Sequence, residues 1–495
     1  MKSIVNFFTR VKKAITAPFK RPISGLKRQS SKLSQKFSFI EILKSKEIRK
    51  KILFTIALII VYRVLAAVPM PGVDISKLFS NAFGGGSPLN SIFTIITGGR
   101  LDSPSVVAIG IGGYINASII IQLLSSVIPK LEELTKEGER GKRIINQYTR
   151  MIAVPLSMVQ AYVIYTVVKN LQQTQGVDIV AANISAFDVI VMVGTLTAGS
   201  IILMWLGELI TEYGIGNGIS IILTIGILAS LPSLVKKDLS FISQDWQLLK
   251  DGNLYVLWNS NFKLIYAILI GIVILVAWVV YITEADRKIP IQYARRIRGA
   301  EGMSSSFLPL KINQAGVMPV IFASAILTFP QIIAQLLLAA TKSGTWLYSF
   351  ATKINTSFLG KNNFSGDLKS FVSYEALYFF FIIIFAYFYT FVTFKPSETS
   401  DNLKKSGGFI PGLRPGKATE NYITQILLRL TFVGSLFLGG VALLPSLIRF
   451  TEKGQTLYIL SGIGGTSILI IIGVILETIR QIKSLTVSKS YDQYK

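Results

Sequence analysis

Residues 103–131 read SPSVVAIGIGGYINASIIIQLLSSVIPKL, which contains an apolar run long enough to cross a bilayer. The run is poorly suited to facing lipid, because Gly110, Gly112 and Gly113 loosen a helix. Asn116 and Gln122 add amides, for which hydrocarbon offers no hydrogen-bond partner. Polar, Gly-rich helix is tolerated in a membrane where it faces protein or a water-filled cavity. The stretch therefore predicts a spanning helix that faces the inside of a larger membrane protein.

The composition supports a polytopic membrane protein. Hydrophobic residues make up 51% of 495, and several runs reach the ~20 apolar residues that a bilayer requires. Lys and Arg number 51 against 26 Asp and Glu; such a basic balance alone would suggest nucleic-acid binding, but the hydropathy outweighs it. The sequence holds no Cys and no His, which excludes disulfides and the usual zinc or copper ligands. It also lacks a GxxxxGK[ST] phosphate-binding loop, so it shows no obvious means of hydrolysing ATP.

Hydropathy predicts ten transmembrane helices, and hence an all-α fold. The predicted spans are 51–68, 104–128, 150–169, 186–206, 217–235, 263–283, 315–338, 373–394, 421–448 and 457–480. With a cytoplasmic N-terminus, the cytoplasmic segments and their flanks hold about 36 of the 51 Lys and Arg. The positive-inside rule therefore places both termini in the cytoplasm.

An odd number of spans in each half inverts the second half relative to the first, as in many transporters, and places the working path between the halves. The expected organisation is a basic cytoplasmic extension over 1–50, an N-terminal half over 51–235, an external linker over 236–262, a C-terminal half over 263–480 and a cytoplasmic tail over 481–495. The C-terminal half carries cytoplasmic loops over 284–314 and 395–420. The extension lacks the apolar core of a signal peptide; residues 4–19 suit either an amphipathic helix on anionic lipid or a solvated tail.

Seven motifs in order along the chain resemble the SecY/Sec61-alpha family, whose members are channel subunits of the protein-secretion translocon. They are VYRVLAAVPMPGVD (61–74), GIGGYINASIIIQLL (110–124), KEGERGKRIINQYTR (136–150), MWLGELITEYGIGNGISIIL (204–223), LPLKINQAGVMPVIFASAIL (308–327), PSETSDNLKKSGGFIPGLRPGKATENYI (396–423) and GGTSILIIIGVILETIRQI (464–482). The similarity covers roughly residues 38 to 485. One departure is Gly113, where the family commonly has proline, so the local bend of the helix is expected to differ.

The resemblance implies a pore that conducts unfolded secretory chains and is sealed by a ring of aliphatic side chains, which dewets when empty. The ring falls on Ile111, Ile115, Ile219, Leu223, Ile321 and Ile470. Taken without the family, an Ile in a span indicates only packing or lipid contact. The family's displaceable plug falls on 90–101, with Asn90, Phe93, Ile96, Gly98 and Gly99 as its marked residues. Without the family, that segment reads as a re-entrant helix and loop.

The resemblance also implies a lateral gate between the second and seventh spans, through which apolar segments pass into lipid. Its polar residues would be Asn116, Gln122 and Asn313. The alternative for Asn116 and Gln122 is an ordinary hydrogen bond to a neighbouring helix, worth about 0.6–2 kcal/mol.

Two cytoplasmic loops concentrate positive charge. The cations are Arg295, Arg296 and Arg298 in the first loop and Lys404, Lys405 and Arg414 in the second. An excess of loop cations sets the orientation of a membrane protein whether or not the cations bind a partner, but Arg also makes bidentate contacts with carboxylate and phosphate. The resemblance implies that these loops dock the SecA motor ATPase and the ribosome, whose RNA is polyanionic. Arg414 lies at the position the family uses most critically.

Other expected partners are the small membrane subunits SecE and SecG, signal sequences and nascent secretory chains, and the lipid of a bacterial plasma membrane, with a thylakoid membrane less favoured. No cofactor or metal is expected, and the chain is not expected to be an enzyme. The alternative function is a secondary transporter of a small solute, which would keep carboxylates near the membrane midplane. The ionisable residues in the spans instead lie near span ends; they are Arg63, Glu208, Glu375, Arg429 and Glu477.

Overall fold

The computed structural model describes residues 46–71, 105–175, 185–229, 231–232, 261–293, 306–341, 344–359, 368–451 and 465–492. The predicted plug over 90–101, most of the linker over 236–262 and the Arg295, Arg296 and Arg298 cluster lie outside these ranges. Residues 52–481 form one compact unit, and the helix ends over 46–51 and 482–492 belong to a second unit.

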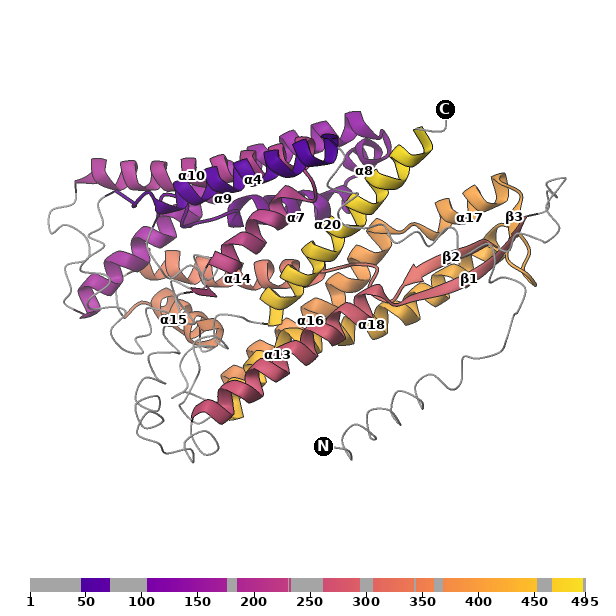
Figure 1. Ribbon diagram of the computed structural model, residues 1–495. Coiled ribbons are helices and arrows are strands. Elements are labelled where there is room, and N and C mark those ends of the chain that lie inside the picture. The colour runs from indigo at the N-terminus through magenta and orange to yellow at the C-terminus, as the bar shows by residue number, and fades with distance from the viewer. Residues whose placement is uncertain are drawn as a thin grey trace, which may run out of the picture. The chain divides into compact units, whose positions relative to one another are not determined.

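The described chain is mostly helical (Figure 1). Its helices are α4 (Lys46–Ala67), α7 (Gly112–Val127), α8 (Pro129–Lys136), α9 (Glu139–Gln175), α10 (Ala186–Tyr213), a helix over Gly218–Ala229, α13 (Asn261–Glu284), α14 (Met318–Ala340), α15 (Trp346–Leu359), α16 (Leu368–Thr393), α17 (Pro396–Lys405), α18 (Lys417–Thr451) and α20 (Gly465–Asp492). Among the described residues, four helices are long and apolar enough to cross a membrane, and a fifth span results if the bent pair α7–α8 counts as one. The protein is therefore a helical membrane protein with several apolar spans.

The second predicted span begins later than the hydropathy suggested. Residues 105–111 form turns instead of the first turns of a helix, with Ala108 N–H bonded to the Ser105 carbonyl and Gly110 N–H to the Val107 carbonyl. Gly110 has φ +64°, a conformation that favours glycine and interrupts a helix. An isolated antiparallel bridge joins Ser105 to Pro69, after the end of α4. The prediction of helix from 104 was wrong because apolarity alone does not separate a buried turn from a buried helix.

Two large hydrophobic clusters lie among the described helices of residues 52–481. One joins residues of α4, α7, α9, α10, the 218–229 helix and α20; the other joins residues of α7, α13, α14, α16, α18 and α20. Contacts run from α10 to α9, on to α7, then to α14, α16 and α18, an order that Figure 1 lets the reader follow. α7 and α20 contribute to both clusters, and Ile115 belongs to both. The junction of the two clusters therefore lies along α7 and α20.

A small sheet joins the two loops that follow α13 and α16. Its strands are β1 (Asp286–Tyr293), β2 (Ser306–Lys311) and β3 (Gly408–Phe409), in the order β2-β1-β3 with antiparallel pairing. Ile289, Leu310 and Ile410 from this region are buried against Ile423 and Leu427 of α18. The sequence analysis predicted charged loops here without a sheet, because β1 and β2 are separated along one loop and β3 lies in another, so their pairing leaves little local signal.

Candidate functional site

Small residues let the stretch around Gly110 approach α9 and α10 closely. Ser200 of α10 donates its hydroxyl to the Gly110 carbonyl at 2.9 Å, and its oxygen lies 3.2 Å from that of Ser157 on α9. A Cβ added at Gly113 would overlap the Ser157 hydroxyl. Glycine at 113 therefore serves close helix packing, and the Gly-rich face of this stretch lies against protein.

We expect Gly199→Ala to destabilise the protein by about 1–3 kcal/mol, the usual cost of overpacking a core. A Cβ at Gly199 of α10 would overlap the carbonyl oxygen of Val106, which is backbone and cannot rotate away. Gly194 of the same helix is the matched control, because a Cβ there meets nothing within 4 Å. Thermal unfolding of the solubilised protein measures both variants: Gly199→Ala should unfold at a lower temperature, and Gly194→Ala should not. Equal midpoints would contradict the close approach.

Four of the six predicted ring residues lie in one hydrophobic cluster. Ile111 is buried, and Ile115, Ile219 and Ile470 pack against the same cluster as half-buried side chains. They come from four elements, namely the 105–111 turns, α7, the 218–229 helix and α20. Leu223 and Ile321 are half-buried on the 218–229 helix and on α14, and among the described side chains they fall outside this cluster. Ile115 and Ile470 lie on α7 and α20, along which the two clusters meet, and Ile111 and Ile219 pack in the same cluster from segments distant in sequence.

The turn between α10 and the 218–229 helix positions Ile219. The Ile215 N–H donates to the Thr55 hydroxyl of α4 at 3.2 Å, and the Gly216 N–H donates to the side-chain oxygen of Gln481 on α20. The Asn217 side-chain oxygen accepts from the Ile219 N–H at 3.1 Å, as an N-cap does. Sequence reasoning did not predict the partners of this turn. The sequence signal was GIGNG, because a tight turn leaves backbone N–H groups unpaired, and such groups need hydrogen-bond partners when they are buried.

α7 and α14, the second and seventh predicted spans, are in contact. Ile119 of α7 is buried in the cluster that includes Val320, Ala323 and Leu327 of α14. Asn116, which is buried, and Gln122, which is half-buried, lie one helical turn before and after Ile119. The structure therefore brings both amides beside the α7–α14 contact and leaves the helices closed against each other.

Asn313, the third predicted gate residue, lies just before α14. It is buried, and its side-chain amide donates to the Gly316 carbonyl at 3.1 Å. Gly316 has φ +65°, so this turn depends on a glycine. Asn313 thus fixes the turn from which α14 begins.

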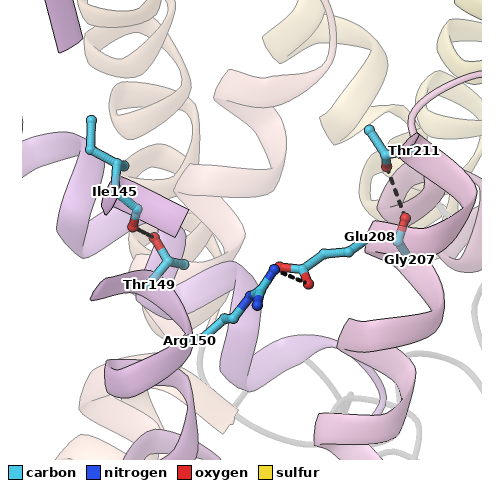
Figure 2. Close-up of polar contacts among 6 residues, drawn as sticks. All are labelled: Ile145, Thr149, Arg150, Gly207, Glu208 and Thr211. Carbon is cyan, nitrogen blue, oxygen red and sulfur yellow. Dashed lines mark hydrogen bonds and ion pairs between the residues drawn. The ribbon is translucent and has the colours of Figure 1, made fainter. Parts of the chain in front are cut away.

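An ion pair joins α9 to α10 (Figure 2). Arg150 Nε lies 2.9 Å from one Glu208 carboxylate oxygen, and an Arg150 Nη lies 2.7 Å from the other, which is a bidentate geometry. The Arg150 side chain is 47% exposed and that of Glu208 is 15% exposed. The pair satisfies a carboxylate within an apolar helix, so Glu208 is not free to bind an ion for coupled transport. Sequence reasoning noted Glu208 and missed its pairing with Arg150, 58 positions away.

Charges also gather where the β1–β2 ladder lies near the end of α13 and Arg480, which is in the middle of α20. Asp286 and Lys311 are partners across the β1–β2 ladder, and Arg480 of α20 donates to the Thr283 carbonyl at the end of α13. Burial of Lys311 lowers its pKa, and the nearby Arg480 lowers that pKa further, while neighbouring carboxylates raise it. Arg480 is well placed there, since a helix C-terminus attracts cations.

The loop that carries Arg414 has a fixed backbone and an exposed side chain. Gly412 and Gly416 have φ +84° and +109°, which bend the chain on either side of Arg414. The Arg414 carbonyl accepts from the Thr419 hydroxyl at 3.1 Å, and the Gly416 carbonyl accepts from the Ser400 hydroxyl of α17 at 2.9 Å. The Arg414 side chain is exposed, as are Lys404 and Lys405 at the end of α17. The guanidinium is thus presented outward from a shaped loop.

Within the described residues, no group of three His, Cys, Asp or Glu side chains gathers as a metal site would require. Glu375 lies two turns inside α16 and is buried at 7% exposure.

By fold and site, the chain is a polytopic membrane protein with an aliphatic junction between two helical cores and outward-facing cations on its loops. A family model described as SecY matches residues 105–479. The chain belongs to the SecY family. It is a protein-conducting translocation channel subunit, a non-enzymatic component of the translocase.

Relatives and solved structures agree with this assignment. The chain is 39% identical over 464 residues to the protein translocase subunit SecY of Mycobacterium bovis, covering 92% of this chain and 99% of that protein. It is also 39% identical over 469 residues to the corresponding subunit of Corynebacterium glutamicum, with the same coverage. A solved protein-conducting channel shares its fold at TM-score 0.61 and 20% identity, over 90% of this chain and 94% of that one. Sec61 in a canine ribosome–channel complex from the endoplasmic reticulum matches at TM-score 0.58 and 19% identity, with the same coverage.

Proposed function

We propose that the aliphatic side chains at the junction of the two cores seal the idle channel, and that unfolded secretory polypeptides pass between them. The supporting observation is the cluster that draws Ile111, Ile115, Ile219 and Ile470 together from four elements. A constriction of bulky apolar side chains expels water when empty and yields to a chain in transit. Leu223 and Ile321 complete the proposed ring by resemblance alone.

The proposed topology has ten spans in two inverted halves, 51–235 and 263–480, with both termini in the cytoplasm of a bacterial cell. The cation-rich loops support this orientation, because cytoplasmic loops carry an excess of Lys and Arg. The named relatives are bacterial, which favours the plasma membrane. In this orientation the three-stranded sheet and the Arg414 loop face the cytoplasm.

The proposed lateral gate lies between α7 and α14. Their contact through the cluster around Ile119 supports a closed resting gate. Separation of these helices would open a path from the junction to lipid, through which an apolar segment leaves sideways. This path is lined or supported by Asn116, Gln122 and Asn313. When the helices separate, hydration of these amides would offset part of the packing free energy that is lost.

The proposed docking surface for SecA and the ribosome comprises Arg295, Arg296, Arg298, Lys404, Lys405 and Arg414. The exposed guanidinium of Arg414 on a fixed loop supports docking, since a fixed donor fork loses little freedom on binding carboxylate or phosphate. The sheet β2-β1-β3 ties the two loops into one platform, so a partner on one loop meets the other. SecE and SecG are the proposed membrane partners.

The direct test uses vesicles that contain the full chain with SecE and SecG. On addition of SecA and ATP, an unfolded secretory protein should become resistant to external protease, and vesicles without the chain should leave it digested. The same vesicles measure uptake of small labelled solutes driven by an ion gradient. Solute uptake without protein export would support the alternative, a secondary transporter, and would refute the channel.

Deletion of Asn90–Gly99, the proposed plug, should leave the protein assembled and able to export, because the segment is too short to span the bilayer. The deletion should raise the ion leak of idle channels, because the segment is proposed to fill the external side of the pore. Conductance of reconstituted channels and yield of assembled protein are the two measurements. Loss of assembly would show instead that the segment is structural.

A further inference from the structure

α15 is a short amphipathic helix between α14 and α16 that hydropathy did not predict. Ala351 is fully buried and marks the side that packs on the two neighbouring helices, with both of which α15 is in contact. One flank carries Trp346, Leu347 and Phe350, which are 76%, 42% and 46% exposed. At 100° per residue, the flank on the other side of Ala351 carries Thr352, which is exposed.

The position of α15 along the membrane normal follows from its neighbours. α14 contains an apolar stretch over Met318–Leu338 that is long enough to cross the bilayer. α15 begins at Trp346, a few residues after α14 ends at Ala340, and it packs back against α14 and α16. Since a few residues reach only a short way at ~3.5 Å each, α15 lies at the membrane boundary, at the end of α14 opposite β2.

We propose that α15 lies in the bilayer interface and inserts Trp346, Leu347 and Phe350 at the boundary between lipid headgroups and acyl chains. Trp is enriched at this depth, because its ring is apolar and its N–H requires a polar partner. The Trp346 and Phe350 rings stack with centroids 5.7 Å apart, and together they present one continuous aromatic surface. The opposite flank, with Thr352, then faces water.

A protein partner fits this flank less well than lipid does. A fully buried aromatic side chain contributes about 150–250 Å², so three partly exposed side chains offer far less than the ~800 Å² per partner of a stable interface. An interfacial helix needs no such area, because it adds its apolar flank to a lipid-facing surface that the spans already provide. In this role α15 holds the end of α14 at the membrane surface.

Spin labelling tests the proposal directly, because the chain contains no Cys and each new thiol is therefore unique. The full chain carrying Phe350→Cys or Thr352→Cys is labelled with a nitroxide and reconstituted in vesicles of phosphatidylethanolamine and phosphatidylglycerol. The label at 350 should be accessible to oxygen and protected from a water-soluble nickel chelate, and the label at 352 should show the reverse. Equal access of the nickel chelate to both labels would place the flank in water. Protection of the label at 350 from both reagents would place it under protein. Either result overturns the proposal.

A second measurement leaves the flank almost intact. Tryptophan fluorescence of the native chain and of Trp346→Phe is compared in vesicles of lipids brominated near the headgroup or near the acyl end. The difference between the two proteins, which reports Trp346, should be quenched more strongly by shallow bromines than by deep ones. Absence of quenching at either depth would also overturn the proposal.

Discussion

Arg414→Glu should nearly abolish SecA-driven export, and Arg414→Lys should weaken it. Lys keeps the charge but loses the planar five-donor fork that binds carboxylate or phosphate at two points. The loop itself should survive both changes, because Gly412, Gly416 and the hydrogen bond from Thr419 to the Arg414 carbonyl fix its backbone. The measurement is ATP-dependent export into vesicles with purified SecA, together with protease access to residues 395–420.

Lys130→Glu is the matched control, because Lys130 is exposed on α8 and the substitution changes the net charge equally. Export by this variant should be close to normal. If loop cations only set orientation, Arg414→Lys would be silent, since the positive-inside rule counts charge and not shape. Normal export by Arg414→Glu, with the loop still cytoplasmic, would refute docking through Arg414.

Ile470→Asn should raise the ion conductance of idle channels, and Ile115→Asn should do the same. An amide holds water where isoleucine expels it, so either change wets the constriction. Both side chains pack against the hydrophobic cluster that also holds Ile111 and Ile219. Ile470 lies on α20 and Ile115 on α7. The leak is measured across a planar bilayer that contains reconstituted channels without substrate. Secretory proteins with defective signal sequences should also pass more easily.

Ile475→Asn on the same helix is the control, because Ile475 is 48% exposed and lies on a different face of α20. Its effect on resting conductance should be negligible. If Ile115→Asn and Ile470→Asn both conduct no more than the unaltered protein, these side chains do not form the seal.

Much of the helical fold could be predicted from hydropathy, since apolar runs such as 186–206 and 421–448 correspond to parts of α10 and α18. The start of α7 at Gly112 could not be predicted in this way, because most of the seven preceding residues are apolar and hydropathy does not distinguish a turn from a helix. α15 was missed because it is amphipathic and too short to span. The β2-β1-β3 sheet was missed because β1 and β2 are separated along one loop and β3 comes from another.

The candidate site was predictable only through motif resemblance. Nothing in the spacing of Ile111, Ile219 and Ile470 indicates that they meet, because their meeting depends on how distant helices pack. Packing also explains the glycine at 113, where the family commonly has proline. A Cβ at this position would overlap Ser157, and glycine has none. The partner of Glu208 was in principle foreseeable, because a carboxylate in an apolar helix requires a cation, but the sequence does not single out Arg150.

The central claim is that a polypeptide in transit passes through the junction of the two cores. The sharpest test captures it there by disulfide formation, which requires Cα atoms within about 7 Å. A secretory precursor with one cysteine, stalled midway by a tightly folded C-terminal domain, is offered to Ile470→Cys, Ile219→Cys and Ile60→Cys chains that otherwise contain no Cys. Ile60 of α4 is 58% exposed and lies outside the cluster formed by the described side chains. We predict disulfides at 470 and 219 and none at 60. Equal capture at all three positions, or capture at 60 alone, would contradict the account.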